Sequence, residues 1–166
     1  MQAELRALSL NAGQDVYDML QEIPRDENGF QNGGHGRSAE DFRAWLAKCD
    51  RVARGEGLES WQVPQTFYIL YADGEPVGMS KLRTAELTDA LREAGGHAGY
   101  AVRPSQRGKG YGKLLLRLLI EEARKAGLNR LLVTVQKQNT PSYRTAMANN
   151  GVVERESEER YYIWVS

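Results

Sequence analysis

The residues best suited to chemistry form a glycine-rich turn beyond the middle of the chain. Gly108, Gly110 and Gly112 alternate with other residues between an apolar segment, 98–102, and a leucine-rich segment, 113–126. Glycines at a helix start leave backbone N–H groups accessible, and these groups and the helix dipole both favour phosphate oxygens. Positive side chains surround the same turn: Arg107, Lys109 and Lys113. The spacing therefore predicts a site for a ligand that carries a pyrophosphate.

Two well-known phosphate-binding motifs do not fit this turn. The nucleoside-triphosphate loop requires Ser or Thr after its Gly-Lys pair, whereas Leu114 follows Gly112 and Lys113 here. The dinucleotide fingerprint requires a third glycine where Lys113 stands, and an acidic residue about 20 positions further on. Segment 128–135 contains no acidic residue. Neither motif accounts for the turn.

The order Arg-x-x-Gly-x-Gly, formed by Arg107, Gly110 and Gly112, resembles the acyl-CoA-binding loop of the GNAT superfamily of N-acetyltransferases. The segment before it, 100–104, resembles the fourth strand of that family. The later segment 139–142 resembles the family's Asn-x-x-Ala/Ser motif, which faces the pantetheine arm. The resemblance covers residues 65–166 well and the N-terminal third loosely. Several short patterns are similar to a bacterial branch of predicted acetyltransferases: Asn28-Gly29-Phe30, Gly95-Gly96-His97, Arg103-Pro104-Ser105 and Asn149-Asn150-Gly151.

This resemblance implies an N-acetyltransferase that uses acetyl-CoA as co-substrate and a primary amine as acceptor. The amine would attack the thioester directly, and the backbone N–H near Val102 would stabilise the tetrahedral oxyanion. The pantetheine would lie between the family's fourth and fifth strands, pairing with their backbones as an added strand does. The residues expected to bind the co-substrate are Val102, Arg107, Gly108, Lys109, Gly110, Tyr111, Gly112, Asn139 and Ser142.

The reaction requires a neutral amine, so a proton acceptor near the thioester would help. A lysine-like amine has a pKa of about 10.4 and is mostly charged at pH 7. His97 begins the fourth strand and is the first candidate base, because its ordinary pKa lies near neutrality; alternatively it packs beneath the sheet. Glu93 is the second candidate, whereas Thr134 occupies the position at which some relatives carry a glutamate. A third group lies in the glycine-rich loop 23–37, either a substrate lid or plain surface: Asp26, Glu27 and His35.

The acid that protonates the leaving thiolate is the other catalytic role to assign. Many relatives place a tyrosine four residues after the Ala/Ser of the second motif, and that position is Ala146 here. Tyr143 lies about one helical turn earlier and is the candidate acid, with a packing role as the alternative. A thiolate also leaves without strong acid assistance, because thiols are far more acidic than alcohols.

Composition limits the class of protein. The chain has 166 residues, 41% of them hydrophobic, which is consistent with one compact domain over residues 1–166. Its 22 basic and 22 acidic residues balance, so a dedicated nucleic-acid binder is not expected. The single cysteine, Cys49, excludes an internal disulfide and is typical of a reducing cytoplasm. Because Cys49 continues an apolar helix stripe with Phe42, Trp45 and Leu46, we expect it to be buried rather than nucleophilic.

No apolar run is long enough to cross a bilayer. We therefore expect a cytoplasmic monomer or homodimer that binds no metal, membrane or nucleic acid.

The hydrophobic periodicity predicts an α/β fold. By resemblance to the GNAT fold, a mixed, mostly antiparallel sheet is flanked by helices. The expected strands are 4–10, 65–71, 76–82, 97–103, 131–136, 152–153 and 161–165. The expected helices are 15–21, 38–49, 87–93, 113–126 and one that opens at 139–142 and ends at 149–151. Segment 23–37 is expected to be a loop, and the charged run 154–160 to connect the last two strands. The resemblance further implies that strands 97–103 and 131–136 splay apart.

Three alternatives to a small-molecule acetyltransferase remain at this stage. The acceptor could be a protein N-terminus or a lysine, and an acidic groove would favour such a peptide. The chain could also be a CoA-binding regulatory module without catalysis, since the family tyrosine is absent. The third alternative is a nucleotide-binding interaction domain, and only the glycine turn supports this hypothesis.

Overall fold

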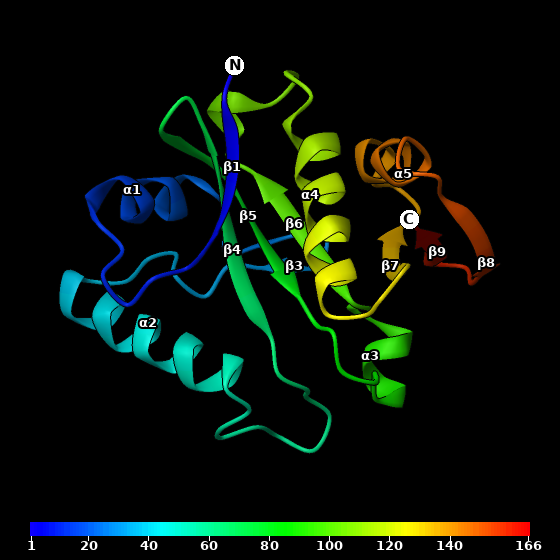
Figure 1. Ribbon diagram of the computed structural model, residues 1–166, viewed down its shortest axis with the longest axis horizontal. Helices are drawn as coiled ribbons and strands as arrows, with labels where there is room; N and C mark the ends of the chain where they lie inside the picture. The colour runs from blue at the N-terminus through cyan, green and yellow to red at the C-terminus, as the bar shows by residue number, and fades with distance from the viewer.

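The computed structural model describes residues 1–166 and contains two sheets that lie side by side (Figure 1). The first sheet consists of β1 (Ala3–Ala7), β4 (Thr66–Ala72), β5 (Glu75–Leu82) and β6 (Ala98–Val102), hydrogen-bonded in this order. The second consists of β7 (Leu131–Gln136), β9 (Arg160–Val165) and β8 (Val152–Glu156), again in this order. All their pairings are antiparallel. The predicted α/β class, with antiparallel strands flanked by helices, is confirmed.

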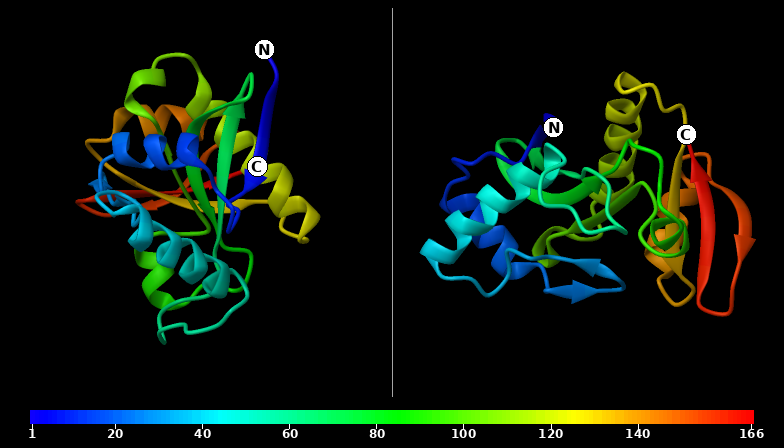
Figure 2. Two further views of the ribbon diagram at one scale, coloured as in Figure 1. Left: turned by 90° about the vertical axis from the view of Figure 1, so that its left-hand side faces the viewer. Right: turned by 90° about the horizontal axis from the view of Figure 1, so that it is seen from below.

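Helices cover both faces of the first sheet (Figures 1 and 2). On one face lie α1 (Gln14–Glu22) and α2 (Ala39–Ala53), whose apolar stripes face the sheet. Ser38 caps α2 through a hydrogen bond from the Asp41 N–H, as the sequence predicts for a capping residue. These two helices and the inner face of β4 and β5 form the first part of the core.

The other face is covered by α4 (Tyr111–Lys125). Its buried side chains repeat at helical spacing and contact both sheets: Leu115, Leu116, Leu119, Ile120 and Ala123. Three short helices complete the chain: α3 (Asp89–Glu93), the 3₁₀ turn η1 (Pro104–Gln106) and α5 (Thr140–Met147). Since α4 packs against strands of both sheets, it fixes the position of one sheet relative to the other.

The strands β6 and β7 are edge strands of the two sheets, and they meet only where β6 begins. There the His97 N–H donates to the Leu132 carbonyl at 2.8 Å, and the Leu132 N–H donates to His97 Nδ1 at 2.9 Å. Gly96 permits this approach, because a Cβ on it would lie 2.4 Å from the Leu132 carbonyl oxygen. Beyond this junction the two strands are not paired, as expected for splayed strands.

A short hairpin, β2 (Asp26–Glu27) and β3 (Phe30–Gln31), lies where the sequence predicts a loop. Asn28 and Gly29 both have positive φ, 53° and 84°, as in a type I′ turn. The Asn-Gly pair indicates this turn, but its flanking residues lack the alternation that marks strands. Figure 2 (right) shows the hairpin extending from the first sheet toward the half that contains β7 and β9.

The C-terminal hairpin differs from the prediction in the length of its first strand. The structure extends β8 through Glu156, into the run expected to be a connection. Every residue of β8 is exposed, and charged side chains are typical of such an edge strand, so its sequence carries no apolar alternation. By contrast, the strands expected at 65–71 and 76–82 form the antiparallel pair β4 and β5, and Asp73 and Gly74 in the turn between them have φ of 49° and 83°.

Candidate functional site

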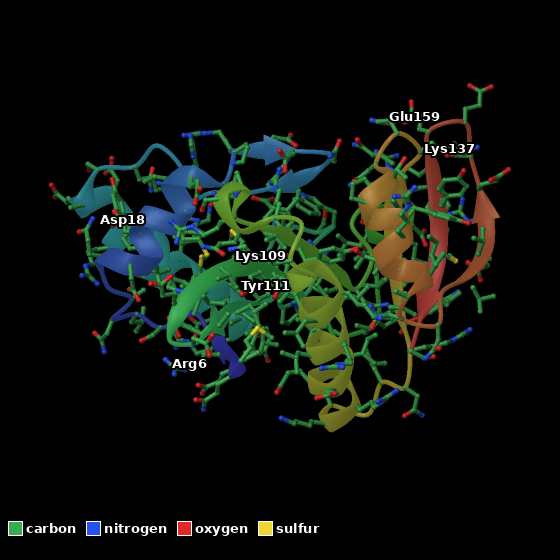
Figure 3. All side chains as sticks on the ribbon, turned by 90° about the horizontal axis from the view of Figure 1, so that it is seen from above. Arg6, Asp18, Lys109, Tyr111, Lys137 and Glu159 are labelled. Atoms are coloured by element: carbon green, nitrogen blue, oxygen red, sulfur yellow. The ribbon has the colours of Figure 1, made fainter.

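A cleft of about 800 Å³ opens between β6 and β7. Its walls are the two strands, the first turns of α4 and α5, and the β2–β3 hairpin. Figure 3 shows the start of α4, marked by Lys109 and Tyr111, between the two halves of the molecule. All predicted co-substrate residues line this cleft except Lys109, whose exposed Nζ instead donates to Gln106 Oε1 at 2.8 Å.

The glycine turn contains a row of backbone donors that have no partner within the protein. Gly108 and Gly110 adopt positive φ, 79° and 85°, and a Cβ on either would meet only open space. Residues 108–113 donate no backbone hydrogen bond within the protein; the first helical donor is the Leu114 N–H, which bonds to the Gly110 carbonyl. No side chain caps α4. These six N–H groups and the helix dipole would favour an anion, and they lie where the sequence predicts a pyrophosphate.

Arg107 connects this turn to the hairpin. Its guanidinium pairs with the carboxylate of Glu27, and its Nε donates to the Val102 carbonyl at 3.0 Å. Glu27 is the only acidic residue among those that line the cleft. The phosphate-binding end is therefore positive, and the hairpin is held against it by an ion pair.

The free edge of β6 supplies further backbone groups. The Arg103 N–H donates to the Val77 carbonyl of the neighbouring strand at 2.9 Å. Because peptide groups alternate in direction along a strand, the N–H groups of Tyr100 and Val102 point the other way, toward the cleft. The backbone donor that the sequence places near Val102 thus has the required orientation.

On the side of α5, Asn139 and Ser142 lie together at the helix start. Asn139 caps the helix, accepting a hydrogen bond from the Ser142 N–H at 3.3 Å. The Tyr100 hydroxyl, from β6, lies 2.8 Å from the Ser142 hydroxyl. Burial raises the pKa of Tyr100 to about 12, so the phenol stays protonated and can donate a hydrogen bond.

Tyr143, the candidate acid, lies outside the cleft lining. Its ring packs against Tyr161, with centroids 4.9 Å apart, and the position of the family tyrosine is the fully buried Ala146. The tyrosine whose hydroxyl reaches the start of α5 and whose residue lines the cleft is instead Tyr100. The reason is helical geometry: Ser142 and Thr145 face the cleft, and Tyr143 does not.

His97, the first candidate base, also lies outside the cleft lining, as in the alternative in which it packs beneath the sheet. Only 8% of its surface is exposed, and its Nδ1 accepts the hydrogen bond from Leu132. Burial, followed by the charges of Arg83 and Arg92, lowers its pKa to about 4. At neutral pH the ring is a neutral acceptor that joins β6 to β7, and this geometry does not support it as the general base.

The remaining base candidates also lack access to the acceptor end. Glu93 is exposed outside the cleft lining, and a hydrogen bond from the Tyr162 hydroxyl at 2.9 Å, together with Arg155, lowers its pKa. In the predicted third group, Glu27 lines the cleft but pairs with Arg107, whereas Asp26 and His35 do not line it. Sequence proximity to the fourth strand was the reason for choosing Glu93, and the turn at Gly95 and Gly96 carries it away.

Two cleft residues that the sequence analysis did not single out are Lys81 and Arg83. Both follow the apolar part of β5, and both line the cleft. Burial, with Arg83 as the next cause, lowers the pKa of Lys81 to about 8, and burial lowers that of Arg83 to about 10. Their signal in the sequence is two cations at alternate positions at the end of a buried strand.

Other features add no candidate chemistry. Burial raises the pKa of Cys49 to about 12, which leaves the thiol protonated and unreactive. No three His, Cys, Asp or Glu side chains are grouped closely enough to hold a metal ion. None of the helices has the length and apolar character that crossing a bilayer requires.

Comparisons with known proteins identify the fold and the family. No curated protein sequence matches the chain significantly. Among solved structures, the fold is similar to that of the N-acetyltransferase PseH from Campylobacter jejuni in complex with acetyl coenzyme A: identity 14%, TM-score 0.65, 99% of each chain covered. It is also similar to YncA from Salmonella typhimurium with its cofactor acetyl-CoA: identity 16%, TM-score 0.64, 100% of this chain and 94% of that one covered.

A third similar structure is a Salmonella typhimurium acetyltransferase that modifies the N-terminal serine of ribosomal protein L7/L12. Its identity is 14% and its TM-score 0.66, with 100% of this chain and 95% of that one covered. The acetyltransferase (GNAT) family matches residues 18–151, which include the cleft walls from the β2–β3 hairpin to α5. Because this match spans most of the chain, the protein belongs to the acetyltransferase (GNAT) family.

Proposed function

We propose that this acetyltransferase moves the acetyl group of acetyl-CoA to the primary amine of a small molecule. The observation that carries the proposal is the row of unpartnered N–H groups in residues 108–113, all of which except Lys109 line a cleft between two splayed strands. A pyrophosphate bound there would leave the rest of the co-substrate to extend along the free edge of β6. PseH and YncA, which share the fold, bind acetyl-CoA.

The chemistry proposed for the cleft is direct attack of a neutral amine on the thioester carbonyl. A new C–N bond forms, the carbonyl oxygen becomes an oxyanion, and the N–H groups of Tyr100 or Val102 donate to it. The C–S bond then breaks and the electron pair leaves on sulfur. The protonated Tyr100 hydroxyl donates a hydrogen bond to this thiolate. Tyr100 thus takes the place of the absent family tyrosine.

The amine loses its proton to water in this proposal. Neither an imidazole nor an unpaired carboxylate lines the cleft, because Glu27 is engaged by Arg107. The remaining ionisable side chains at the acceptor end are the cations Lys81 and Arg83.

The β2–β3 hairpin supports a small acceptor. A Cβ on Gly29 would lie 3.2 Å from Gln136 of β7, and one on Gly99 of β6 would lie 3.4 Å from the Phe30 ring. The hairpin thus crosses the cleft from one splayed strand to the other. A recess covered in this way fits a metabolite better than an extended peptide.

A protein N-terminus is the second candidate acceptor. It is favoured by the fold shared with the acetyltransferase that modifies the N-terminal serine of L7/L12. A peptide acceptor would need the hairpin to move, and the lack of an acidic groove disfavours basic peptides and lysine side chains.

Thermal unfolding with added ligands tests the proposal first. We expect acetyl-CoA to raise the melting temperature far more than ATP or NAD at equal concentration, because a ligand bound only by the folded state stabilises it by mass action. Equal shifts from all three would indicate a generic anion site. The second measurement is CoA release with a panel of amines and N-terminal peptides, and stabilisation without turnover on any of them would indicate a CoA-binding module without catalysis.

A further inference from the structure

Two cations stand side by side at the end of the cleft away from the glycine turn. Lys81 pairs in register with Gly99 of β6, and the Arg83 N–H donates to the His97 carbonyl, so both lie toward the start of β6. The glycine turn follows the other end of that strand. Residues at alternate positions share a face of the sheet, and the two side chains therefore reach the same part of the cleft.

Neither cation has an acidic partner. Lys81 forms no hydrogen bond or ion pair; its Nζ lies 4.8 Å from the centre of the Phe30 ring and 5.6 Å from that of Phe67. Arg83 forms no ion pair, and a single hydrogen bond from its guanidinium reaches the Gly96 carbonyl at 3.0 Å. By contrast, two other cleft cations, Arg107 and Arg160, each pair with a glutamate.

Lys81 and Arg83 are both partly buried. Removing a charge from water without giving it a partner is costly, and the cost is greater when two like charges are neighbours. The depressed pKa values of Lys81 and Arg83 reflect this burial. Residues that only filled space at these positions would be apolar, as are Met79 and Leu82 on the same strand. An anion between the two side chains would remove the penalty, with the guanidinium fork of Arg83 providing several donors.

We propose that the amine acceptor carries an anionic group, a carboxylate or a phosphate, that binds between Lys81 and Arg83 while the amine faces the thioester. This inference rests on the proposed function, because it places the acceptor at the end of the cleft remote from the phosphates of CoA. The pair thus selects among amines by charge and orients the one that binds.

Matched acceptors test the inference through the ratio of their kcat/KM values. One pair is an amino acid and its amide; the other is O-phosphoethanolamine and ethanolamine. We expect the anionic member of at least one pair to be preferred over its neutral counterpart by at least tenfold. The pair that shows this preference tells whether the bound group is a carboxylate or a phosphate. Arg83→Gln and Lys81→Gln should each reduce this ratio at least tenfold, whereas Arg83→Lys should retain part of it.

The matched control is Arg92→Gln, which removes an equal charge from an exposed side chain on α3 outside the cleft lining. It should keep the wild-type ratio. Equal use of charged and neutral acceptors by the wild type would overturn the inference, as would a ratio that survives in both glutamine variants. Failure of the proposed function is distinct, since acetyl-CoA would then neither stabilise the protein nor acetylate any amine.

A binding measurement on the wild type keeps the test decisive if the glutamine variants do not fold. With CoA present, N-acetyl amino acids should raise the melting temperature more than the corresponding N-acetyl amino acid amides. Equal shifts would overturn the inference without any variant.

The pH dependence separates anion binding by Lys81 from a role as base. Its amine faces the charges of Arg83, directly after β5, and of Asp26 on β2, and the thiol of Cys49 on α2, which is neutral at these pH values. The pKa of Lys81 is about 8. Binding an anion requires the charged form, so kcat/KM of the wild type divided by that of Lys81→Arg should fall above about pH 8. This quotient cancels the ionisation of the acceptor itself. A quotient that rises above that pH would make Lys81 a base and overturn the inference as stated.

Discussion

At the scale of single residues, the position of the hydroxyl group distinguishes the two tyrosines near α5. Tyr100 places its hydroxyl against Ser142 inside the cleft, whereas Tyr143 packs its ring on Tyr161 outside it. Tyr100→Phe removes only the hydroxyl, and we expect kcat to fall about tenfold, equivalent to about 1.4 kcal/mol in the barrier. The measurement is steady-state kinetics at saturating acetyl-CoA.

The matched control for this prediction is Tyr143→Phe. It should change kcat by less than about twofold, because its ring packing is retained. If Tyr143→Phe were the more damaging of the two, the thiolate would have to leave on the other side of α5, and the role proposed for Tyr100 would be wrong.

At the scale of elements, the junction between η1 and α4 determines co-substrate binding. Gly110→Val places a branched side chain where the backbone has φ of 85° and where only open cleft surrounds it. We expect the affinity for acetyl-CoA to fall more than a hundredfold, because the side chain occupies the space of the phosphates. Calorimetric titration with acetyl-CoA measures the loss.

Gly74→Val is the control that separates this effect from backbone strain. Gly74 has φ of 83°, equally open surroundings and a position in the β4–β5 turn outside the cleft lining. Both variants should lose at least about 1–2 kcal/mol of stability, which is the cost of a left-handed backbone in a residue other than glycine. Only Gly110→Val should lose binding; normal binding by this variant would show that the anion site lies elsewhere.

At the scale of the whole molecule, the cleft exists because two sheets meet at one end and diverge. We propose that residues 1–166 form one domain, since α4 packs against strands of both sheets. The junction itself is the reciprocal pair of hydrogen bonds between His97 and Leu132. His97 therefore contributes to stability rather than to proton transfer.

We expect His97→Ala to cost about 1–3 kcal/mol of stability at pH 7, because the buried Leu132 N–H loses its acceptor. The folded pKa of about 4 lies below the ordinary value of 6.5. As pH falls through this interval the unfolded chain binds the proton first, so stability present above pH 6.5 is lost toward pH 4. The difference between wild type and variant, measured by denaturant unfolding, should therefore shrink over the same interval.

The kinetic profile gives this prediction a second readout. If His97 were the base, a plot of kcat/KM against pH would show a pH-dependent limb near neutral pH for the wild type, and the His97→Ala variant would lose this limb. We expect the limb to be unchanged, and its loss would contradict the structural role.

Local chemistry in the sequence determined the elements and the anion site. Gly108 and Gly110, between a strand and a helix, indicate their conformation directly, because positive φ and free N–H groups depend on neighbouring residues alone. The same is true of the Ser38 cap, the Asp73-Gly74 turn and the stripe on α4. These features, together with the GNAT resemblance, were sufficient for the α/β class and for a set of residues that, apart from Lys109, line one cleft.

Only the tertiary structure decided which side chains share the cleft. His97 and Tyr143 lie next to the expected motifs in the sequence. Along a strand, however, neighbouring side chains point to opposite faces, and along a helix, neighbouring side chains point in different directions around the axis, so neither side chain reaches the cleft. Lys81 and Tyr100 come from neighbouring strands, and Arg83 follows directly after one of them. The hairpin that covers them, residues 26–31, lies 50 or more positions before Lys81 and Arg83 in the sequence. Burial of charge and the absence of a partner are properties of this packed arrangement, and no spacing along the chain encodes them.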